Sequence, residues 1–270
     1  MAYYTEDSLM NRVREHAEEL EKMEKDYFFV ALQGSWNYGL GYEGSDVDTK
    51  ALILPSFKDI VMSKEPISTT HVLENNEHID MKDIRVMFQN FWKQNINFLE
   101  ILFTDYVVVN PMYIEEYKML TAMAEEIAKY DIKKALNCMS GMAQEKYHAM
   151  EHPYPAVVDK IEKFGYDGKQ LHHIFRLTNF ISAYVRGKSF KSCLTSFDVY
   201  SKEDLMRAKR NEFTLEEARM IAKANCDAIH EVKEYYLAEN KVKVNKETRA
   251  AAEDVLYRVL EKRFRYELSI

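Results

Sequence analysis

The N-terminal part of the chain combines hydrophobic patterns of helices and of strands. Within residues 7–25, apolar side chains recur along one side, which predicts an amphipathic helix. The apolar runs 28–32 and 51–54 have the composition of buried strands, and further β-branched residues lie between positions 67 and 81. Residues 83–93 return to helical spacing. These patterns predict an α/β (α+β) domain built on a small mixed sheet.

After Pro111 the pattern becomes helical and strand patterns end. We therefore expect two domains, an α/β domain over residues 1–110 and an all-α domain over residues 111–270. The periodicity of the second part predicts helices near 112–129, 131–150, 155–164, 168–187, 215–238 and 246–266. Residues 188–203 contain Ser, Lys and Asp and are less periodic, so we expect a long surface loop there.

Composition narrows the possible functions. A net charge of −7 disfavours sequence-independent binding of duplex nucleic acid over a broad surface, because such binding depends on many Lys and Arg contacts. Cys138, Cys193 and Cys226 are few and widely spaced, so they predict neither a disulfide framework nor a zinc site. The N-terminus lacks the apolar stretch of a signal peptide, and no segment has the apolar length that crosses a bilayer. We expect a cytoplasmic protein without a membrane partner.

The candidate chemistry lies between two predicted strands. The first strand ends at Gly34 and Ser35, and the second follows Asp46 and Asp48. Because strand side chains alternate between faces, the two aspartates point the same way. Paired acids require a compensating cation or a raised pKa, and a divalent metal is the simpler answer. Mg²⁺ takes one or two carboxylates and leaves its other positions to water and substrate phosphates. Gly34 lets backbone amides approach an anion and Ser35 adds a hydroxyl donor, so this corner is a candidate site for the end of a triphosphate. The connecting loop contains Gly39, Gly41 and Gly44.

Each half of this motif also has a plain structural interpretation. A Gly-Ser pair is a common corner, and an Asp-x-Asp pair on an edge strand can simply face solvent. The whole combination is rarer: an apolar strand, Gly-Ser, a loop of about a dozen residues, and Asp-x-Asp leading a second apolar strand. In this combination the chain resembles the DNA polymerase beta-like nucleotidyltransferase superfamily.

A narrower resemblance rests on the sequence GSWNYGL followed by SDVD. This form is similar to a bacterial and phage branch of predicted nucleotidyltransferases, named for its proposed place in an RNA repair pathway. In that branch a third carboxylate follows on a later strand, and Asp80 matches it. Asp83 is the alternative, but we favour Asp80 because Asp83 fits the N-cap of the following helix. Ile96 departs from the branch, which usually has proline there. The segment after the helix matches the branch at Asn95, Asn97, Leu99 and Glu100.

Residues 166–177, YDGKQLHHIFRL, resemble a helix of the same branch that carries Lys, His and Arg. Helical spacing places His172 and Arg176 on one face, near Lys169. The resemblance makes these three residues candidates for nucleotide binding, in addition to the Gly-Ser corner. The alternative is a structural histidine beside a solvated basic face.

The resemblance implies a Mg²⁺-dependent nucleotidyltransferase that moves an NMP from an NTP to an acceptor hydroxyl and releases pyrophosphate. Asp46 and Asp48 would bind two Mg²⁺ ions, for which Mn²⁺ can substitute, and Asp80 would hold the ion that activates the acceptor. The branch and a cluster of Lys and Arg between positions 160 and 191 favour an RNA end as acceptor. Alternative acceptors are a small molecule or a protein. A second interpretation, a module that binds nucleotide without turnover, is disfavoured by the presence of all three carboxylates.

Overall fold

The computed structural model describes residues 6–42 and 45–270, so Gly44 lies outside the described residues. Contacts within the chain define two compact units. The first takes the residues up to Tyr130 together with Val244–Ile270, and the second is Asp131–Lys243. The first unit holds a small mixed sheet with helices, and the second is helical. The predicted fold class is therefore confirmed.

The unit boundary differs from the boundary that the sequence predicts at residues 110 and 111. Pro111 opens a 3-10 helix that continues into α5 (Ile114–Ala122). The rings of Tyr113 and Tyr117 pack edge-on against Phe28, with centroid distances of 6.1 and 6.4 Å. These aromatic contacts pack the start of α5 against the strand that carries Phe28, so the chain remains in the first unit beyond Pro111.

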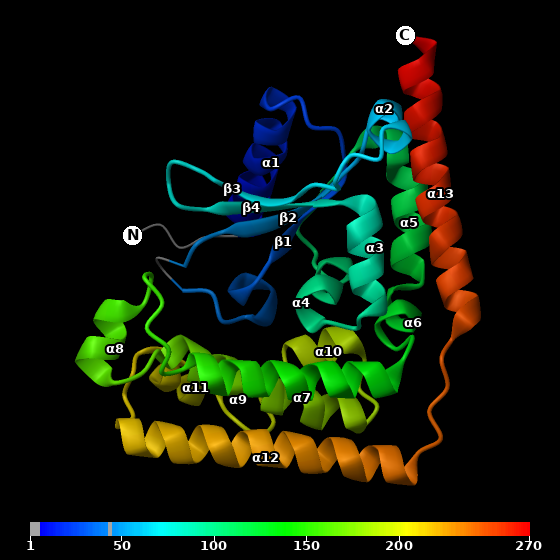
Figure 1. The fold of residues 1–270 in the computed structure, drawn as a ribbon. Coiled ribbons are helices and arrows are strands. Elements are labelled where there is room, and N and C mark those ends of the chain that lie inside the picture. The colour runs from blue at the N-terminus through cyan, green and yellow to red at the C-terminus, as the bar shows by residue number, and fades with distance from the viewer. Residues whose placement is uncertain (1–5, 43–44) are drawn as a thin grey trace. The chain divides into compact units, whose positions relative to one another are not determined.

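The first unit is built around one sheet (Figure 1). Its strands have the order β3-β4-β2-β1-β5. The central pair β2 and β4 is parallel, whereas β1 pairs antiparallel with both β2 and β5, and β3 pairs antiparallel with β4. The elements of this unit are α1 (Glu6–Lys22), β1 (Tyr27–Gln33), β2 (Asp48–Ile53), α2 (Phe57–Val61), β3 (Ser68–Val72), β4 (His78–Asp83), α3 (Ile84–Trp92), α4 (Ile96–Leu99), β5 (Val107–Val109), α5, α6 (Ala124–Ala128) and α13 (Lys246–Ser269).

Helix α1 covers one face of this sheet. Its apolar side, with Val13 and Leu20 fully buried, packs against alternate residues of β1, β2 and β4. Val47 and Ala51 belong to this core, which places Asp48 and Lys50 on the other face. The expectation that Val47 points into the core is confirmed. Helix α3 packs on β2 and β4, and its Ile84, Met87, Phe88 and Phe91 are buried as the sequence predicts.

Helix α13 returns to the first unit from the far end of the chain. It runs beside α5 and packs against α3 and α6 as well (Figure 1). At its outer end the Phe264 ring lies 5.6 Å from the Phe57 ring of α2, and Phe57 donates its N–H to Glu267. At its start Asn245 donates its N–H to the carbonyl of Tyr130 at 2.9 Å. The chain therefore leaves and re-enters the first unit at adjacent backbone positions.

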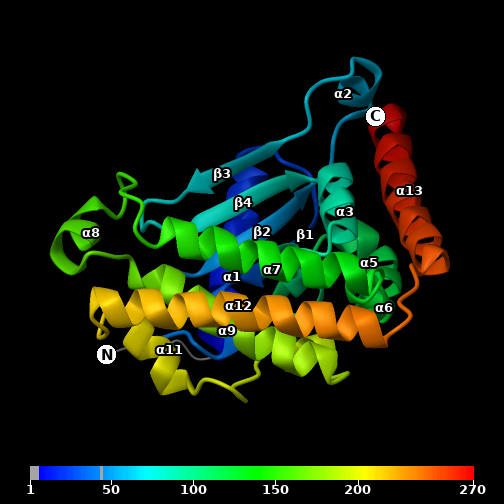
Figure 2. The same ribbon diagram turned by 60° about the horizontal axis from the view of Figure 1, so that its bottom comes forward.

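The second unit is a set of helices in which α7, α9 and α12 pack against one another (Figure 2). The predicted surface loop at 188–203 is wrong in part, because it includes a short helix whose Phe190 and Cys193 are buried. That helix is too short to produce a readable period. The elements are α7 (Ile132–Ala149), α8 (Val158–Phe164), α9 (Gly168–Val185), α10 (Phe190–Leu194), α11 (Lys202–Lys209) and α12 (Leu215–Glu239). No helix in the described parts of the chain has the length and apolar character that crossing a membrane requires.

Candidate active site

Two rows of polar side chains stand next to each other on β2 and β4. Every second residue of a strand faces the same side of a sheet, and the parallel register pairs Lys50 directly with Asp80. The two rows therefore share the face that α1 does not cover. The row on β2 is Asp46, which lies just before the strand, then Asp48 and Lys50, and the row on β4 is His78, Asp80 and Lys82.

Asp46 and Asp48 lie on either side of a fully buried Val47, and both are accessible. Asp46 is exposed, and the side chain of Asp48 is 35% exposed. One carboxylate oxygen of Asp48, Oδ1, accepts the backbone N–H of His78 at 2.9 Å and lies 3.0 Å from His78 Nδ1. His78 thus orients Asp48 toward the neighbouring strand.

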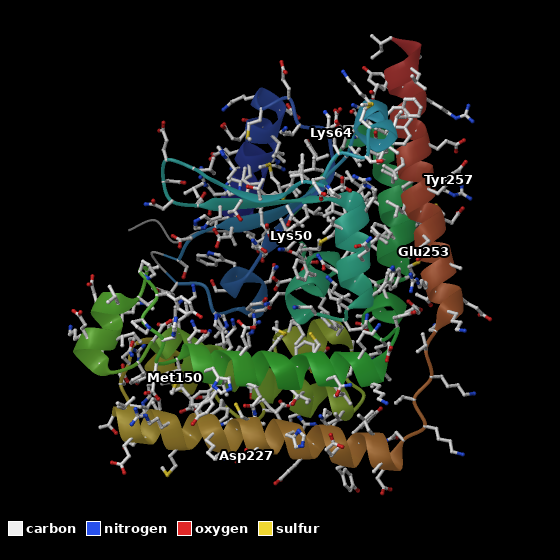
Figure 3. All side chains as sticks on the ribbon, in the orientation of Figure 1. Lys50, Lys64, Met150, Asp227, Glu253 and Tyr257 are labelled. Carbon is white, nitrogen blue, oxygen red and sulfur yellow. The ribbon has the colours of Figure 1, made fainter. Side chains whose placement is uncertain are left out.

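Asp80 sits in the middle of β4 between two lysines. Lys50 Nζ lies 2.5 Å from Asp80 Oδ2, and Lys82 Nζ lies 3.1 Å from Asp80 Oδ1. The Lys50 side chain, labelled in Figure 3, is only 5% exposed. Its ammonium also lies 4.8 Å from the centroid of the Phe98 ring. Burial lowers the pKa of Lys50, and the adjacent Asp80 carboxylate opposes that shift. Each oxygen of Asp80 therefore already contacts a cation.

Asp83 has a structural role at the end of β4. Its side chain accepts the N–H of Arg85 at 2.8 Å, which caps α3, and it forms an ion pair with the Arg85 guanidinium at 2.6 Å. The expectation that Asp83 caps the helix is confirmed. Its buried carboxylate is used locally, which leaves Asp80 as the acid of β4 on the polar face.

The Gly34–Ser35 corner lies next to the start of β2, because Gln33 pairs with Asp48. Gly34 has φ 85° and ψ −149°, a conformation that is essentially restricted to glycine. Its amide N–H donates to Glu100 Oε1 at 3.3 Å, so a carboxylate of the protein already contacts this amide. Ser35 opens a 3-10 helix, and the first N–H groups of such a helix have no partner within it.

The loop after this corner is anchored by its aromatic side chains. Trp36 donates its indole N–H to the carbonyl of Asp46 at 3.2 Å, and Tyr38 is buried. A Cβ at Gly41 would overlap the Trp36 ring, so glycine is required for this packing. The indole therefore ties the loop to the residues that precede β2.

The donor set fits one divalent ion better than two. Within residues 6–42 and 45–270, no three His, Cys, Asp or Glu side chains lie close enough together to hold a metal ion. Asp46 and Asp48 are accessible carboxylates of the kind and number that Mg²⁺ takes from proteins. Asp80 does not fit as a ligand in this arrangement, because Lys50 and Lys82 occupy its two oxygens.

The three candidates on α9 differ in their surroundings. Lys169 is exposed and Arg176 is half-buried. His172 is buried, and its Nδ1 lies 2.9 Å from the carbonyl oxygen of Leu205. Burial lowers the pKa of His172 to about 4, so the ring is neutral at pH 7 and donates its Nδ1 hydrogen to that carbonyl. This geometry supports the structural alternative for His172.

We expect His172→Asn to make the second unit less sensitive to acid. The unfolded chain protonates this histidine near pH 6.5 and the folded chain only near 4, so it reduces stability as the pH falls between these values. The slope is about 1.4 kcal/mol per pH unit for one such group. Asparagine keeps a donor for the Leu205 carbonyl and removes the titration. Urea unfolding between pH 7.5 and pH 4 measures how the free energy of unfolding depends on pH. The difference in this free energy between parent and variant at pH 7.5 measures the packing that the substitution removes. An unchanged slope would contradict the assignment.

Part of the basic cluster between positions 160 and 191 is neutralised within the second unit. Lys160 lies 3.7 Å from the Asp167 carboxylate. Arg186 and Lys188 both contact Asp198, at 2.5 and 2.7 Å. The positive charge that this segment offers to a polyanion is therefore smaller than the sequence indicates.

Sequence reasoning missed several residues of the polar face. Lys50, His78 and Lys82 each lie two positions from a predicted ligand on the same strand, so strand alternation could have placed them on the same face as Asp48 or Asp80. Glu100 matches the branch motif, but no local pattern predicts which residue it contacts. Its contact with Gly34 joins positions 66 residues apart in the sequence.

A search of protein-family models finds no match to this chain, and a search of curated proteins finds none either. The family resemblance thus rests on the motif residues quoted above.

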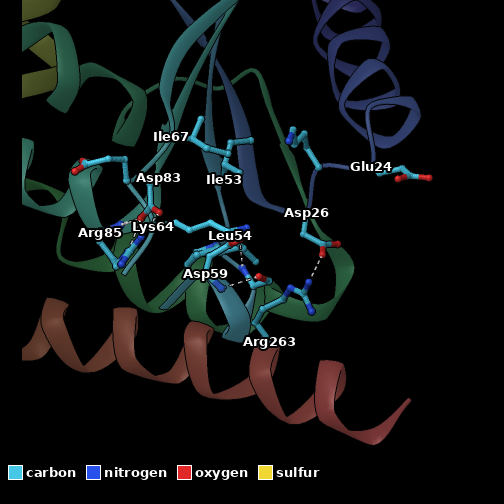
Figure 4. A pocket seen from close by; sticks show the side chains of 14 residues that line it. Glu24, Asp26, Ile53, Leu54, Asp59, Lys64, Ile67, Asp83, Arg85 and Arg263 are labelled. Atoms are coloured by element: carbon cyan, nitrogen blue, oxygen red, sulfur yellow. Dashed lines mark hydrogen bonds and ion pairs between the residues drawn. The ribbon is translucent and has the colours of Figure 1, made fainter. Parts of the chain in front are cut away.

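A cavity of about 330 Å³ lies at the other end of β2 from Asp48 (Figure 4). Six of the charged side chains that line it are paired with one another: Arg85 with Asp83, Lys64 with Asp59, and Arg263 with Asp26. We therefore assign no ligand to it.

Proposed function

We propose that this protein is a Mg²⁺-dependent nucleotidyltransferase that moves an NMP from an NTP to an acceptor hydroxyl. One observation carries the proposal: the Gln33–Asp48 pairing puts the Gly34–Ser35 corner next to the accessible aspartates. The hydroxyl and the N–H of Ser35, beside hard oxygen ligands, suit a metal-bound triphosphate. The motif resemblance to the DNA polymerase beta-like superfamily supports the same proposal.

The residues of the polar face have distinct roles in this proposal. Asp46 and Asp48 supply carboxylate oxygens for the ion, and His78 holds Asp48 in place. Ser35 contributes a hydroxyl and a backbone N–H toward the phosphates. A bound Mg²⁺ would supply positive charge for the triphosphate and for the leaving pyrophosphate. The acceptor oxygen bonds to the α-phosphorus, the bond from that phosphorus to the bridging oxygen breaks, and the hydroxyl proton passes to solvent.

An RNA end is the acceptor that we propose. The resemblance to the RNA repair branch supports it, and so do Lys163 and Lys169, which add positive charge to the segment between positions 160 and 191. Since Lys160, Arg186 and Lys188 contact acids, we expect few phosphate contacts. The dependence of RNA affinity on salt should accordingly be shallow, about −0.7 in log–log slope for each contact.

Labelled nucleotides test this function directly. The protein is incubated with Mg²⁺, with each NTP labelled at the α- or the γ-phosphate, and with total RNA, protein or small molecules. We expect α-label in the RNA fraction and γ-label in pyrophosphate. Label transferred from the γ-position would indicate phosphoryl transfer instead. Nucleotide binding without any transfer would favour the sensing module, and label in another fraction would replace RNA by a protein or small molecule.

A further inference from the structure

We propose that the ammonium groups of Lys50 and Lys82, and not a second divalent ion, balance the charge of Asp80. The site would then bind one divalent ion, through Asp46 and Asp48. This inference rests on the proposed function only in taking those two aspartates as the ligands. It revises the two-ion arrangement that the sequence resemblance implies.

The geometry gives each oxygen of Asp80 its own lysine. Lys50 Nζ lies 2.5 Å from Oδ2 and Lys82 Nζ lies 3.1 Å from Oδ1. The parallel register places Lys50 directly beside Asp80, and Lys82 is two residues further along the same strand. The three groups therefore come from two adjacent, hydrogen-bonded strands. Such a backbone gives the contacts little freedom to rearrange.

Neither lysine has an easy alternative position. The Lys50 side chain is 5% exposed and its ammonium lies over the Phe98 ring, so breaking the contact with Asp80 would leave a buried charge without its carboxylate. Lys82 is 16% exposed and donates to Ser68 Oγ at 2.9 Å as well. An exposed lysine could move into solvent when an ion binds. Each of these two has a second contact, Lys50 with Phe98 and Lys82 with Ser68.

A divalent ion on Asp80 would be repelled by both ammonium groups. It would bind the same oxygens and so stand within a few ångströms of two positive charges, where screening by water is weak. Asp46 and Asp48 have no lysine contact among the described residues, although His78 contacts Asp48. We therefore expect Asp46 and Asp48 to bind a divalent ion more tightly than Asp80 does.

Metal-free unfolding tests the pairing of Asp80 with Lys50. We compare Asp80→Asn, Lys50→Met and the double variant in EDTA, with Glu115→Gln of an exposed ion pair as the matched control. Asp80→Asn leaves the buried Lys50 ammonium without its carboxylate, and Lys50→Met removes one of the two lysines that contact Asp80. Both melting temperatures should therefore fall, that of Asp80→Asn by at least about 5 °C. The double variant should melt above both. A stabilised Asp80→Asn protein would overturn the inference, because acids that await a metal are relieved by neutralisation.

Counting bound Mn²⁺ by electron paramagnetic resonance, without nucleotide, tests the number of ions. We expect one ion per chain in the parent protein and in Asp80→Asn, and none in Asp48→Asn. Two ions in the parent, with one lost in Asp80→Asn, would overturn the inference, and so would the absence of bound Mn²⁺. If Asp80→Asn does not fold, the double variant should still bind one ion. These readouts do not need turnover, so failure of the proposed function would appear separately, as an unlabelled acceptor.

Discussion

Replacing Asp48 by asparagine should reduce NTP turnover by at least about 1,000-fold, because a ligand that stabilises developing charge is worth several kcal/mol. The fold should survive. Asparagine keeps Oδ1, which accepts the backbone N–H of His78 and faces its Nδ1, so the link between β2 and β4 is retained. What the variant loses is the negative charge. Steady-state kinetics with the NTP that labels best measures the loss of turnover, and a thermal melt in EDTA measures whether the fold survives.

The matched control for this prediction is Asp7→Asn, an exposed aspartate in the first turn of α1. It should retain the parent activity. Full activity of Asp48→Asn would remove this residue from the ion site, and a melting temperature far below that of the parent would show that its charge is structural.

The second prediction concerns a buried network on the opposite face of the sheet. Glu77 Oε2 accepts hydrogen bonds from Arg12 and lies 3.0 Å from His16 Nε2. His16 Nδ1 lies 2.9 Å from the hydroxyl of Thr49. Burial lowers the pKa of His16, which favours its neutral ring at pH 7, so Arg12 supplies the full positive charge that contacts Glu77 among the described residues. Thr49 follows Asp48 on β2, so this network holds β2 from the face that α1 covers.

Arg12→Met should destabilise the first unit by about 3 kcal/mol, because it leaves a buried carboxylate without its cation. Burial alone would raise the pKa of Glu77, and the hydrogen bonds from Arg12 and His16 outweigh it, so the pKa is lowered. Without Arg12 that pKa should rise. The variant is then least stable relative to the parent at high pH, and the deficit shrinks as Glu77 becomes protonated. Urea unfolding at pH 8 and pH 5 measures the trend.

Arg14→Met is the control, since Arg14 is exposed and contacts only the side chain of Asn11 among the hydrogen bonds described. A deficit for Arg12→Met no larger than the control's would mean that solvent, rather than Arg12, stabilises Glu77.

Local sequence patterns were enough to locate most elements around the candidate site. The run at 28–32 lies within β1, the helix expected at 83–93 is α3, and Asp83 caps it. These features depend on neighbours within a few residues, and hydrophobic spacing and capping report such neighbours directly. The alternation around Val47 also follows from local sequence alone.

Features that depend on register between distant segments were not predicted. Nothing in the sequence shows that Lys50 lies against Asp80, 30 positions away, so this contact was not predicted. Likewise, the periodicity of α13 does not reveal that its Phe264 meets Phe57. For His172, helical spacing could not decide which side of α9 faces the interior. In each case the missing information is a tertiary contact.

The hydrogen bond between Asn245 and Tyr130 has a consequence for biosynthesis. On the ribosome, residues 131–243 emerge as one continuous segment, whereas the first unit must wait for α13 after its strands have been made. Domains commonly fold as they emerge, N-terminal part first. Here the order is reversed: the inserted helical unit can complete its folding while the sheet still lacks its last helix. Until α13 has been made, the surface of α3, α5 and α6 that it covers stays uncovered in the nascent first unit.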